Sequence, residues 1–310
     1  MKTETNRVCK LIAGFDMEYD MLIRKKYLKV QDRLGMRIGI HGGTKKMPVP
    51  RTVQDVLKIL RELYNIGLKA YILPKEFFSK IKVTTDLYTT YYGELLKIKD
   101  IANKYDIELS IEYPNLPDPP DETLKIFITI ASVMGCRMFI VRPDFYPMVP
   151  QDQALRLTVY KINEIVSEVN AKAKIGMETA GKIDELGSLE DIVEIAKRTR
   201  ETNIVINWGN IHARGSGSLR TTEDFDKVVK KVSEGIGVGY FREAFFIFGG
   251  VSYGPSGLVR KIPIKNCDMK LEDLIKQIMT YGMRGTLILD DPGKEQFTLQ
   301  ILDRLADTVR

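Results

Sequence analysis

The chain has 310 residues, and its hydrophobic fraction of 44% is enough for one large α/β domain or two smaller ones. Lys and Arg (47) outnumber Asp and Glu (41), which gives a net charge of +6 and a pI near 9.0. This balance favours polyanionic partners, although a Lys-rich surface without such a role has the same composition. Three widely separated cysteines without a CxxC pair indicate neither a disulfide framework nor a thiolate zinc site.

No stretch approaches the roughly 20 apolar residues of a membrane span. The apolar run near the start of the sequence is too short and too interrupted for a signal peptide. We therefore expect a cytoplasmic protein that does not enter a membrane.

Residues 1–35 differ from the rest, because they are charged and hold no strand-like segment. We interpret them as an appended helical arm. Four apolar side chains could pack it against the main domain: Leu22, Tyr27, Leu28 and Val30. Alternatively, the cluster Arg24, Lys25 and Lys26 could contact nucleic acid, or the arm could dock to a protein partner.

From Met36 onward, a short apolar or β-branched run alternates with an amphipathic stretch of 3.6-residue period. The expected strands are 36–42, 69–74, 108–113, 136–143, 174–179, 203–208, 243–250 and 285–291, and clear helical patterns cover 53–67, 121–135, 152–169 and 188–200. Such alternation requires a parallel sheet with right-handed crossovers, and eight units close into a (β/α)8 TIM barrel. We therefore predict one domain over 36–310.

Helix-boundary signals agree with the predicted alternation of strands and helices. Thr52 and Ser188 stand where helix N-caps are expected, and Asp191 follows Ser188 by three residues. Gly67, Gly135 and Gly282 fall at the ends of helical runs, where a left-handed residue ends a helix without steric cost. The Pro-rich piece 114–120 is interpreted as a loop between a strand and a helix.

In a barrel of this kind, function lies just after each strand. The apolar run Ile204–Asn207 leads into a polar, Gly-rich stretch that we expect to be a loop carrying Trp208, Asn210, His212 and Arg214. The candidate ligand-binding or nucleic-acid-binding residues at the mouth are Glu112, Arg142, Glu178, Asn207, Asn210, His212, Arg214, Lys261 and Asp290. His41 ends the first strand and is most simply a buried, hydrogen-bonded histidine.

Three of these residues are carboxylates: Glu112, Glu178 and Asp290. They could hold a hard cation such as Mg or Mn, with Asn207 adding an oxygen ligand. Alternatively, Arg142 and Lys261 could neutralise them directly. We prefer these ion pairs, because two cations among three anions leave little net charge to attract a metal ion.

A zinc site built on imidazoles is not expected, because the chain has only His41 and His212. No GxSxG, P-loop or GxGxxG motif lies in a strand-turn-helix setting. Four aromatic residues also fall in the expected mouth loops, where they could stack on bases or close the top of the barrel: Tyr113, Phe145, Tyr146 and Trp208.

Several segments together resemble a known family. They are INWGNIHARGSGSL (206–219) followed by TTEDFD, GMETAGK, RPDFY, GGVSYGPSG with KIPI after it, and GTLILDDP. In order and spacing, residues 36–310 resemble the archaeal branch of the endonuclease IV family. Those proteins are (β/α)8 apurinic/apyrimidinic endonucleases within the xylose-isomerase-like superfamily. The resemblance implies incision of DNA at abasic sites by a trinuclear zinc cluster held by His and carboxylate ligands.

Compared with that family, the histidine ligands are replaced in this chain. Glu112, Arg142, Asn210 and Lys261 stand where the family has His, and Asn207 stands where it has Asp. The apolar run 245–248 replaces another His-containing strand. Two carboxylate ligand positions are kept, as Glu178 and Asp290. The resemblance therefore implies that the zinc cluster is not held.

Three functions are compatible with the sequence. The preferred one is a metal-free, catalytically inactive relative that still binds nucleic acid and is associated with DNA repair. The second is an enzyme, either a phosphodiesterase using Mg or Mn on the remaining carboxylates or a sugar isomerase. The third is a subunit of a protein complex that docks through residues 1–35.

Overall fold

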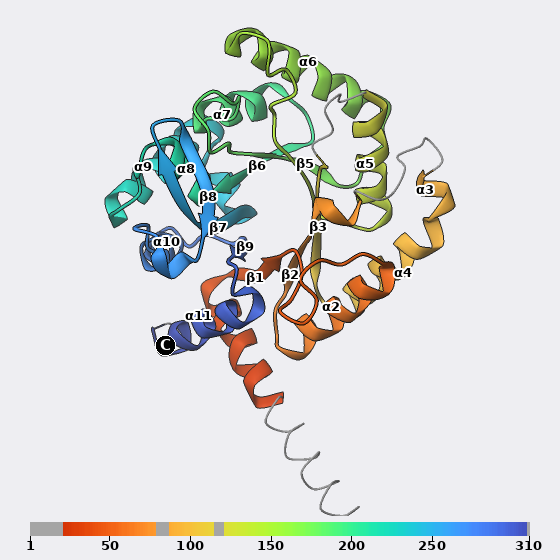
Figure 1. Cartoon of the computed structure of the whole chain (residues 1–310), viewed down its shortest axis with the longest axis vertical. Helices are drawn as coiled ribbons and strands as arrows, with labels where there is room; N and C mark the ends of the chain where they lie inside the picture. The colour runs from red at the N-terminus through yellow and green to blue at the C-terminus, as the bar shows by residue number, and fades with distance from the viewer. Residues whose placement is uncertain (1–20, 79–86, 115–120, 309–310) are drawn as a thin grey trace, which may run out of the picture.

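The computed structural model of the chain describes residues 21–78, 87–114 and 121–308. Eight parallel strands form a closed barrel surrounded by helices (Figure 1). The barrel strands are β1 (Met36–His41), β2 (Ala70–Leu73), β3 (Glu108–Glu112), β4 (Met138–Val141), β5 (Lys174–Glu178), β6 (Thr202–Asn207), β7 (Ala244–Gly254) and β9 (Gly285–Asp290). Their order is β6-β5-β4-β3-β2-β1-β9-β7, and pairing of β6 with β7 closes the ring. The predicted TIM barrel is confirmed, with every predicted strand present.

Helices cover the outside of the barrel. The α-helices are α2 (Val53–Asn65), α3 (Leu87–Thr90), α4 (Tyr92–Lys104), α5 (Asp121–Val133), α6 (Gln151–Glu168), α7 (Leu189–Arg198), α8 (Trp208–Arg214), α9 (Thr222–Ile236), α10 (Leu271–Thr280) and α11 (Lys294–Thr308), with 3-10 turns η1 (Lys75–Phe77), η2 (Val238–Arg242) and η3 (Ile264–Asn266). Both predicted N-caps are present, each as a reciprocal capping box: Thr52 with Asp55, and Ser188 with Asp191. Most of the Pro-rich loop lies outside the described residues, from 115 to 120.

Apolar residues fill the barrel and the layer around it separately. Alternate residues of the strands, among them Ile72, Ile140, Phe245 and Ile247, form a cluster inside the ring. Their neighbours face the helices in a larger cluster. The barrel is therefore a packed core, and only its mouth is available for polar groups.

A hairpin at the barrel mouth was not predicted. β7 continues beyond Gly249, its last residue paired with β9, and β8 (Gly257–Ile262) returns antiparallel to it. The repeat of strand and helix along the sequence gives no sign of this short return strand, which is largely exposed and lacks an apolar run. The hairpin is important for the site, because it carries Lys261 back over the mouth.

The segment after β6 is also not the loop that we expected. Residues Trp208–Arg214 form α8, with the side chain of Asn207 accepting a hydrogen bond from the Asn210 N–H at 3.2 Å as its N-cap. Trp208 is fully buried against Phe225 and Phe246, with ring centroids 5.1 and 5.5 Å away. Burial of this indole outweighs the loop-forming tendency of the surrounding glycines and polar residues.

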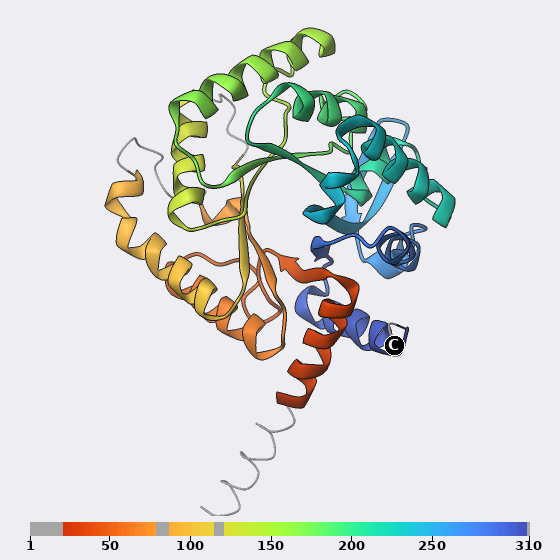
Figure 2. The ribbon, with the colours of Figure 1, turned by 180° about the vertical axis from the view of Figure 1, so that it is seen from behind.

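Residues 21–34 are helical and lie beside α11, as Figures 1 and 2 show. Tyr27 and Val30 are buried in the main core, as predicted, but Leu22 is 62% exposed, so the prediction for Leu22 was wrong. Two of the three clustered cations have partners within the chain. The Arg24 guanidinium lies 4.1 Å from the Tyr64 ring and donates to the Tyr64 carbonyl, and Lys26 forms an ion pair with Asp303 at 2.7 Å.

No helix in the described ranges is both long enough and apolar enough to cross a membrane.

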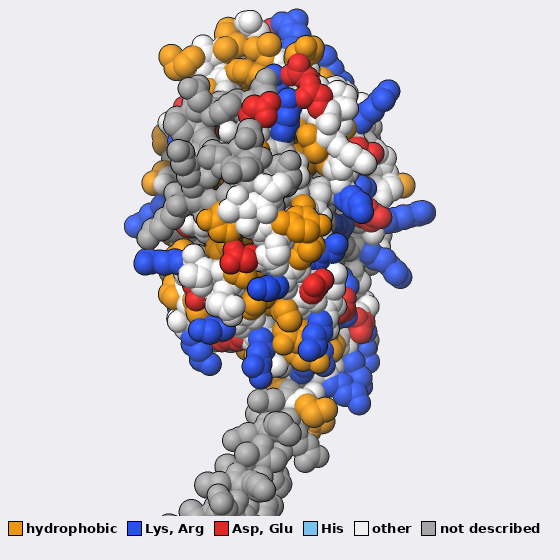
Figure 3. Space-filling model, turned by 90° about the vertical axis from the view of Figure 1, so that its right-hand side faces the viewer, with side chains coloured by type: hydrophobic (Ala, Val, Ile, Leu, Met, Phe, Trp, Pro, Cys, Tyr) orange, Lys and Arg blue, Asp and Glu red, His pale blue; other side chains and the backbone are white. Residues whose placement is uncertain are grey.

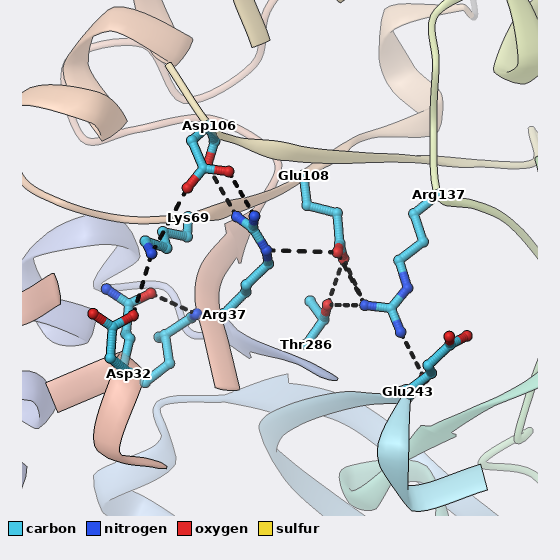
Figure 4. Close-up of polar contacts among 10 residues, drawn as sticks. Asp32, Arg37, Lys69, Asp106, Glu108, Arg137, Glu243 and Thr286 are labelled. Carbon is cyan, nitrogen blue, oxygen red and sulfur yellow. Dashed lines mark hydrogen bonds and ion pairs between the residues drawn. The ribbon is translucent and has the colours of Figure 1, made fainter. Parts of the chain in front are cut away.

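A polar network closes the end of the barrel where the strands begin (Figure 4). Arg137, just before β4, donates to Glu108 at 2.9 Å, to the Thr286 hydroxyl at 2.8 Å and to the Glu243 carbonyl at 2.6 Å. Thr286 also donates to Glu108, whose side chain is only 15% exposed. Charge and hydrogen bonding thus join β3, β4 and β9 at or next to their first residues. Polar contacts at this end of a TIM barrel serve stability, because the catalytic loops lie at the other end.

Glu108→Gln should lower the free energy of unfolding by about 2 kcal/mol, between the values for exposed and buried ion pairs, because Arg137 would lose its anion. Urea denaturation would measure this loss. The matched control is Asp32→Asn, since Asp32 pairs with Lys69 at 3.4 Å but is 68% exposed. Equal losses for both variants would contradict this account of the network.

Candidate functional site

Polar side chains from six strands and the hairpin meet at the mouth of the barrel. They enclose a cavity of about 10 Å³, which is room for about one water molecule. The polar lining consists of His41, Glu112, Arg142, Glu178, Asn207, Lys261 and Asp290, over a floor of Ile72, Ile140 and Ile247. Six of the nine predicted site residues therefore converge, and His41 joins them.

Two carboxylates are paired with fixed cations, as we expected. Glu178 is buried and lies 3.5 Å from the Arg142 Nε, and it accepts a hydrogen bond from the Asn207 amide at 2.8 Å. On the other side, the Lys261 ammonium contacts Asp290. The negative charge of Glu178 is the main cause of the raised pKa of Arg142. Burial lowers the pKa of Lys261, but Asp290 outweighs burial and the pKa is raised.

The third cation of the mouth is His41, which lies between two carboxylates. Its Nε2 is 3.1 Å from Glu112 Oε2, and its Nδ1 is 3.5 Å from Asp290 Oδ1. A neutral imidazole has only one N–H, whereas the imidazolium can donate to both acids. Burial alone would lower the pKa of His41, but Asp290 and Glu112 outweigh it and raise the pKa to about 9.

The same contacts act on the acids. Burial would raise the pKa of Glu112, but hydrogen bonding and charge from His41 lower it to about 2. Asp290 responds in the same way, since His41 and Lys261 outweigh its burial and lower its pKa. At neutral pH, the mouth therefore holds three cations and three anions. We call His41, Arg142, Lys261, Glu112, Glu178 and Asp290 the mouth cluster.

The remaining three predicted site residues do not line this cavity. Asn210 donates to the Thr179 carbonyl at 2.7 Å, beside the cluster. Arg214 donates to the carbonyls of Lys182, Ile183 and Glu185, and so holds the loop after β5 against α8. Both residues have structural partners because α8 turns them away from the mouth.

His212 is fully buried and faces Asp268 rather than the mouth cluster. Its Nδ1 accepts a hydrogen bond from the Leu219 N–H at 3.0 Å, so the ring proton lies on Nε2, which donates to Asp268 Oδ1 at 2.8 Å. His212, Cys267 and Asp268 are close enough together to contact one metal ion. A metal-bound imidazole, however, normally donates from its second nitrogen. Because that nitrogen accepts here, the geometry argues against a metal at these three residues.

The aromatic residues that could have stacked on bases are largely part of the core. Trp208, Tyr113 and Phe145 are buried, and Tyr113 packs edge-on against Phe127 and Phe139. These three residues belong to the apolar layer between the barrel and its helices, so neither base stacking nor closure of the barrel top describes them.

No protein-family model matches the chain. An uncharacterized protein of Methanocaldococcus jannaschii, MJ0133, is 24% identical over 263 residues, which cover 80% of this chain and 90% of that protein.

Three solved structures share the fold over 88% of this chain. SacUVDE superposes with a TM-score of 0.63 at 13% identity and 99% coverage of its own length. Endonuclease IV from Thermus thermophilus superposes with a TM-score of 0.62 at 12% identity, over 99% of its own length. A D-tagatose 3-epimerase-like protein superposes with a TM-score of 0.62 at 14% identity, over 98% of its own length. At these identities, the similarity shows the fold alone. The chain shares its (β/α)8 barrel with these proteins, among which are an endonuclease and an epimerase-like protein, so the fold by itself does not fix the function.

Proposed function

We propose that this chain is an endonuclease IV-like barrel that binds nucleic acid at its mouth and does not cleave it. The observation that supports this proposal best is the mouth cluster. Its three carboxylates are already compensated by three cations, in a cavity with room for about one water molecule. Metal-dependent hydrolysis requires an ion with an open coordination position, and this cluster leaves little space or net negative charge for one.

The residues at the mouth do not fit the zinc cluster that the family resemblance implies. The only imidazole in the cavity lining is His41, and carboxylates face both of its nitrogens. Arg142 and Lys261 occupy positions where the resemblance places histidine ligands. A divalent ion of any kind would have to displace these cations from Glu178 and Asp290. Mg or Mn is therefore the weaker alternative, and no catalytic step is assigned to a metal.

Nucleic acid is the proposed ligand because the similar structures include an endonuclease and because exposed cations surround the mouth. Lys45, Arg260 and Lys265 are exposed on segments at this end of the barrel, and their side chains form no ion pair with other described residues. Such side chains contact phosphates without regard to sequence. Figure 3 shows that basic, acidic and apolar side chains are interspersed on the helical side of the molecule.

Binding to a short fluorescein-labelled duplex with a central abasic-site analogue tests the proposal by fluorescence anisotropy. Replacing Lys45, Arg260 and Lys265 together with Gln should weaken binding about tenfold or more. The slope of log K against log salt concentration should become shallower by about three, since each lost phosphate contact lowers its magnitude by about one. The matched control replaces three cations at the opposite end of the barrel: Lys104, Lys174 and Arg284. It changes the net charge equally and should bind as the wild type does.

Absence of binding at low salt, or equal losses in the two triple variants, would contradict the proposed surface. The same duplex, incubated with Mg, Mn or Zn and resolved on a denaturing gel, should remain intact. Strand breaks that depend on Glu178, together with stoichiometric bound metal, would show an active enzyme instead.

A further inference from the structure

A second cavity lies on the mouth side of the molecule but outside the barrel. Its volume is about 340 Å³, within the range of small-molecule sites. It lies among the start of α2, the turn η1, and helices α4 and α5. In Figure 1, α2, α4 and α5 follow one another around the barrel. None of its lining residues belongs to the mouth cluster.

The inner wall of this cavity is apolar and aromatic. Phe77, Phe78, Leu95 and Ile130 are all buried and contribute to it. The Phe77 and Phe78 rings pack edge to face, with centroids 5.1 Å apart, and Phe78 packs in the same way on Phe127. These contacts fix the wall in place, so that a flat apolar molecule would meet a preformed surface. Tyr91, which is 40% exposed, stands at the opening.

The rim of the cavity is positively charged. Arg51 and Lys97 line it, with Glu94 as the only acidic residue among its described lining. All three are exposed, and neither cation forms an ion pair with another described residue. On the neighbouring surface, by contrast, Lys125 is paired with Glu122 and Glu168. Two cations and one anion above an apolar wall are complementary to a molecule with one charged end.

We propose that this cavity binds a planar aromatic compound that carries one negatively charged group. The ring would lie against Phe77, Leu95 and Ile130, and the anionic group would face Arg51 and Lys97. This site would be separate from the proposed nucleic-acid surface, and its occupation would not depend on that function.

Isothermal titration with 2-naphthoate and with 2-naphthalenemethanol, its neutral analogue, tests the proposal on the full chain. The acid should bind with one-to-one stoichiometry and about tenfold more tightly than the alcohol, as expected for a charge-assisted hydrogen bond. Arg51→Gln with Lys97→Gln should remove that preference, whereas Glu94→Gln should strengthen binding of the acid. Arg61→Gln, an exposed cation on α2 outside the cavity, is the control and should change nothing.

NMR spectra of methyl-labelled protein locate the bound naphthoate independently, because its binding should shift the Leu95 and Ile130 methyl signals. No binding at millimolar naphthoate, equal affinity for acid and alcohol, or shifts confined to other residues would overturn the proposal. All the substituted residues are exposed, so the variants should fold as the wild type does, which circular dichroism checks.

Discussion

Arg142→Met should lower the free energy of unfolding by about 3 kcal/mol, which is the loss expected when one member of a buried ion pair is removed. Glu178 is only 5% exposed on its side chain, and the substitution would leave it with the Asn207 amide as its remaining close partner. The mouth cluster would then hold two cations and three anions. Urea denaturation at neutral pH, with the m-value compared between variants, measures the effect.

The second half of this experiment restores the charge balance. In the double variant Arg142→Met with Glu178→Gln, two cations face two anions again, and the loss should be smaller than the sum of the two single losses by at least about 1 kcal/mol. Additive losses would mean that the Arg142 side chain stabilises the barrel by packing alone. In that case the mouth cluster would not be the electrostatic unit described above.

The residues that converge at the mouth could be predicted from sequence because the barrel has a regular period. Each strand runs in the same direction, so the residue that follows an apolar run lies at the same end of the barrel as its counterparts in the other strands. Glu112, Glu178 and Asp290 are identifiable in this way. The pairing of Arg142 and Lys261 with the acids follows from charge balance.

The wrong predictions concern the chain between the strands. In an extended loop, Asn210, His212 and Arg214 would all lie close to the mouth, but in α8 each residue turns by about 100° from the one before. The deciding contact, burial of Trp208 against Phe225, joins two residues that are far apart in the sequence, so no local pattern indicates it. The position of Lys261 likewise depends on the β7–β8 hairpin, which interrupts the regular repeat of strand and helix.

The charge of His41 could not be predicted either, because it depends on distances to two acids on other strands. Its position at the end of β1 was a usable signal, since the acids end their own strands in the same way. With His41 protonated, the cluster is balanced at three cations and three anions rather than carrying one excess negative charge. That difference removes most of the remaining attraction for a metal ion.

The protonation of His41 should make the stability of the barrel depend on pH in the alkaline range. Its pKa is raised from 6.5 to about 9 on folding. The stabilisation is therefore complete below pH 6.5, declines as the pH rises, and is lost above about pH 9. A shift of this size corresponds to about 3 kcal/mol. The lowered pKa values of Glu112 and Asp290 act in the opposite direction, so their contribution is present above about pH 4.5 and is lost in acid.

The difference in unfolding free energy between the wild type and His41→Gln isolates this contribution, because other groups that titrate near pH 9 are common to both proteins. That difference should be largest near pH 6 and smaller by about 3 kcal/mol near pH 9.5. A difference that stays constant over this range would show that His41 is neutral in the folded protein. The mouth would then carry a net negative charge, which would favour binding of a divalent cation by Glu112 and Asp290.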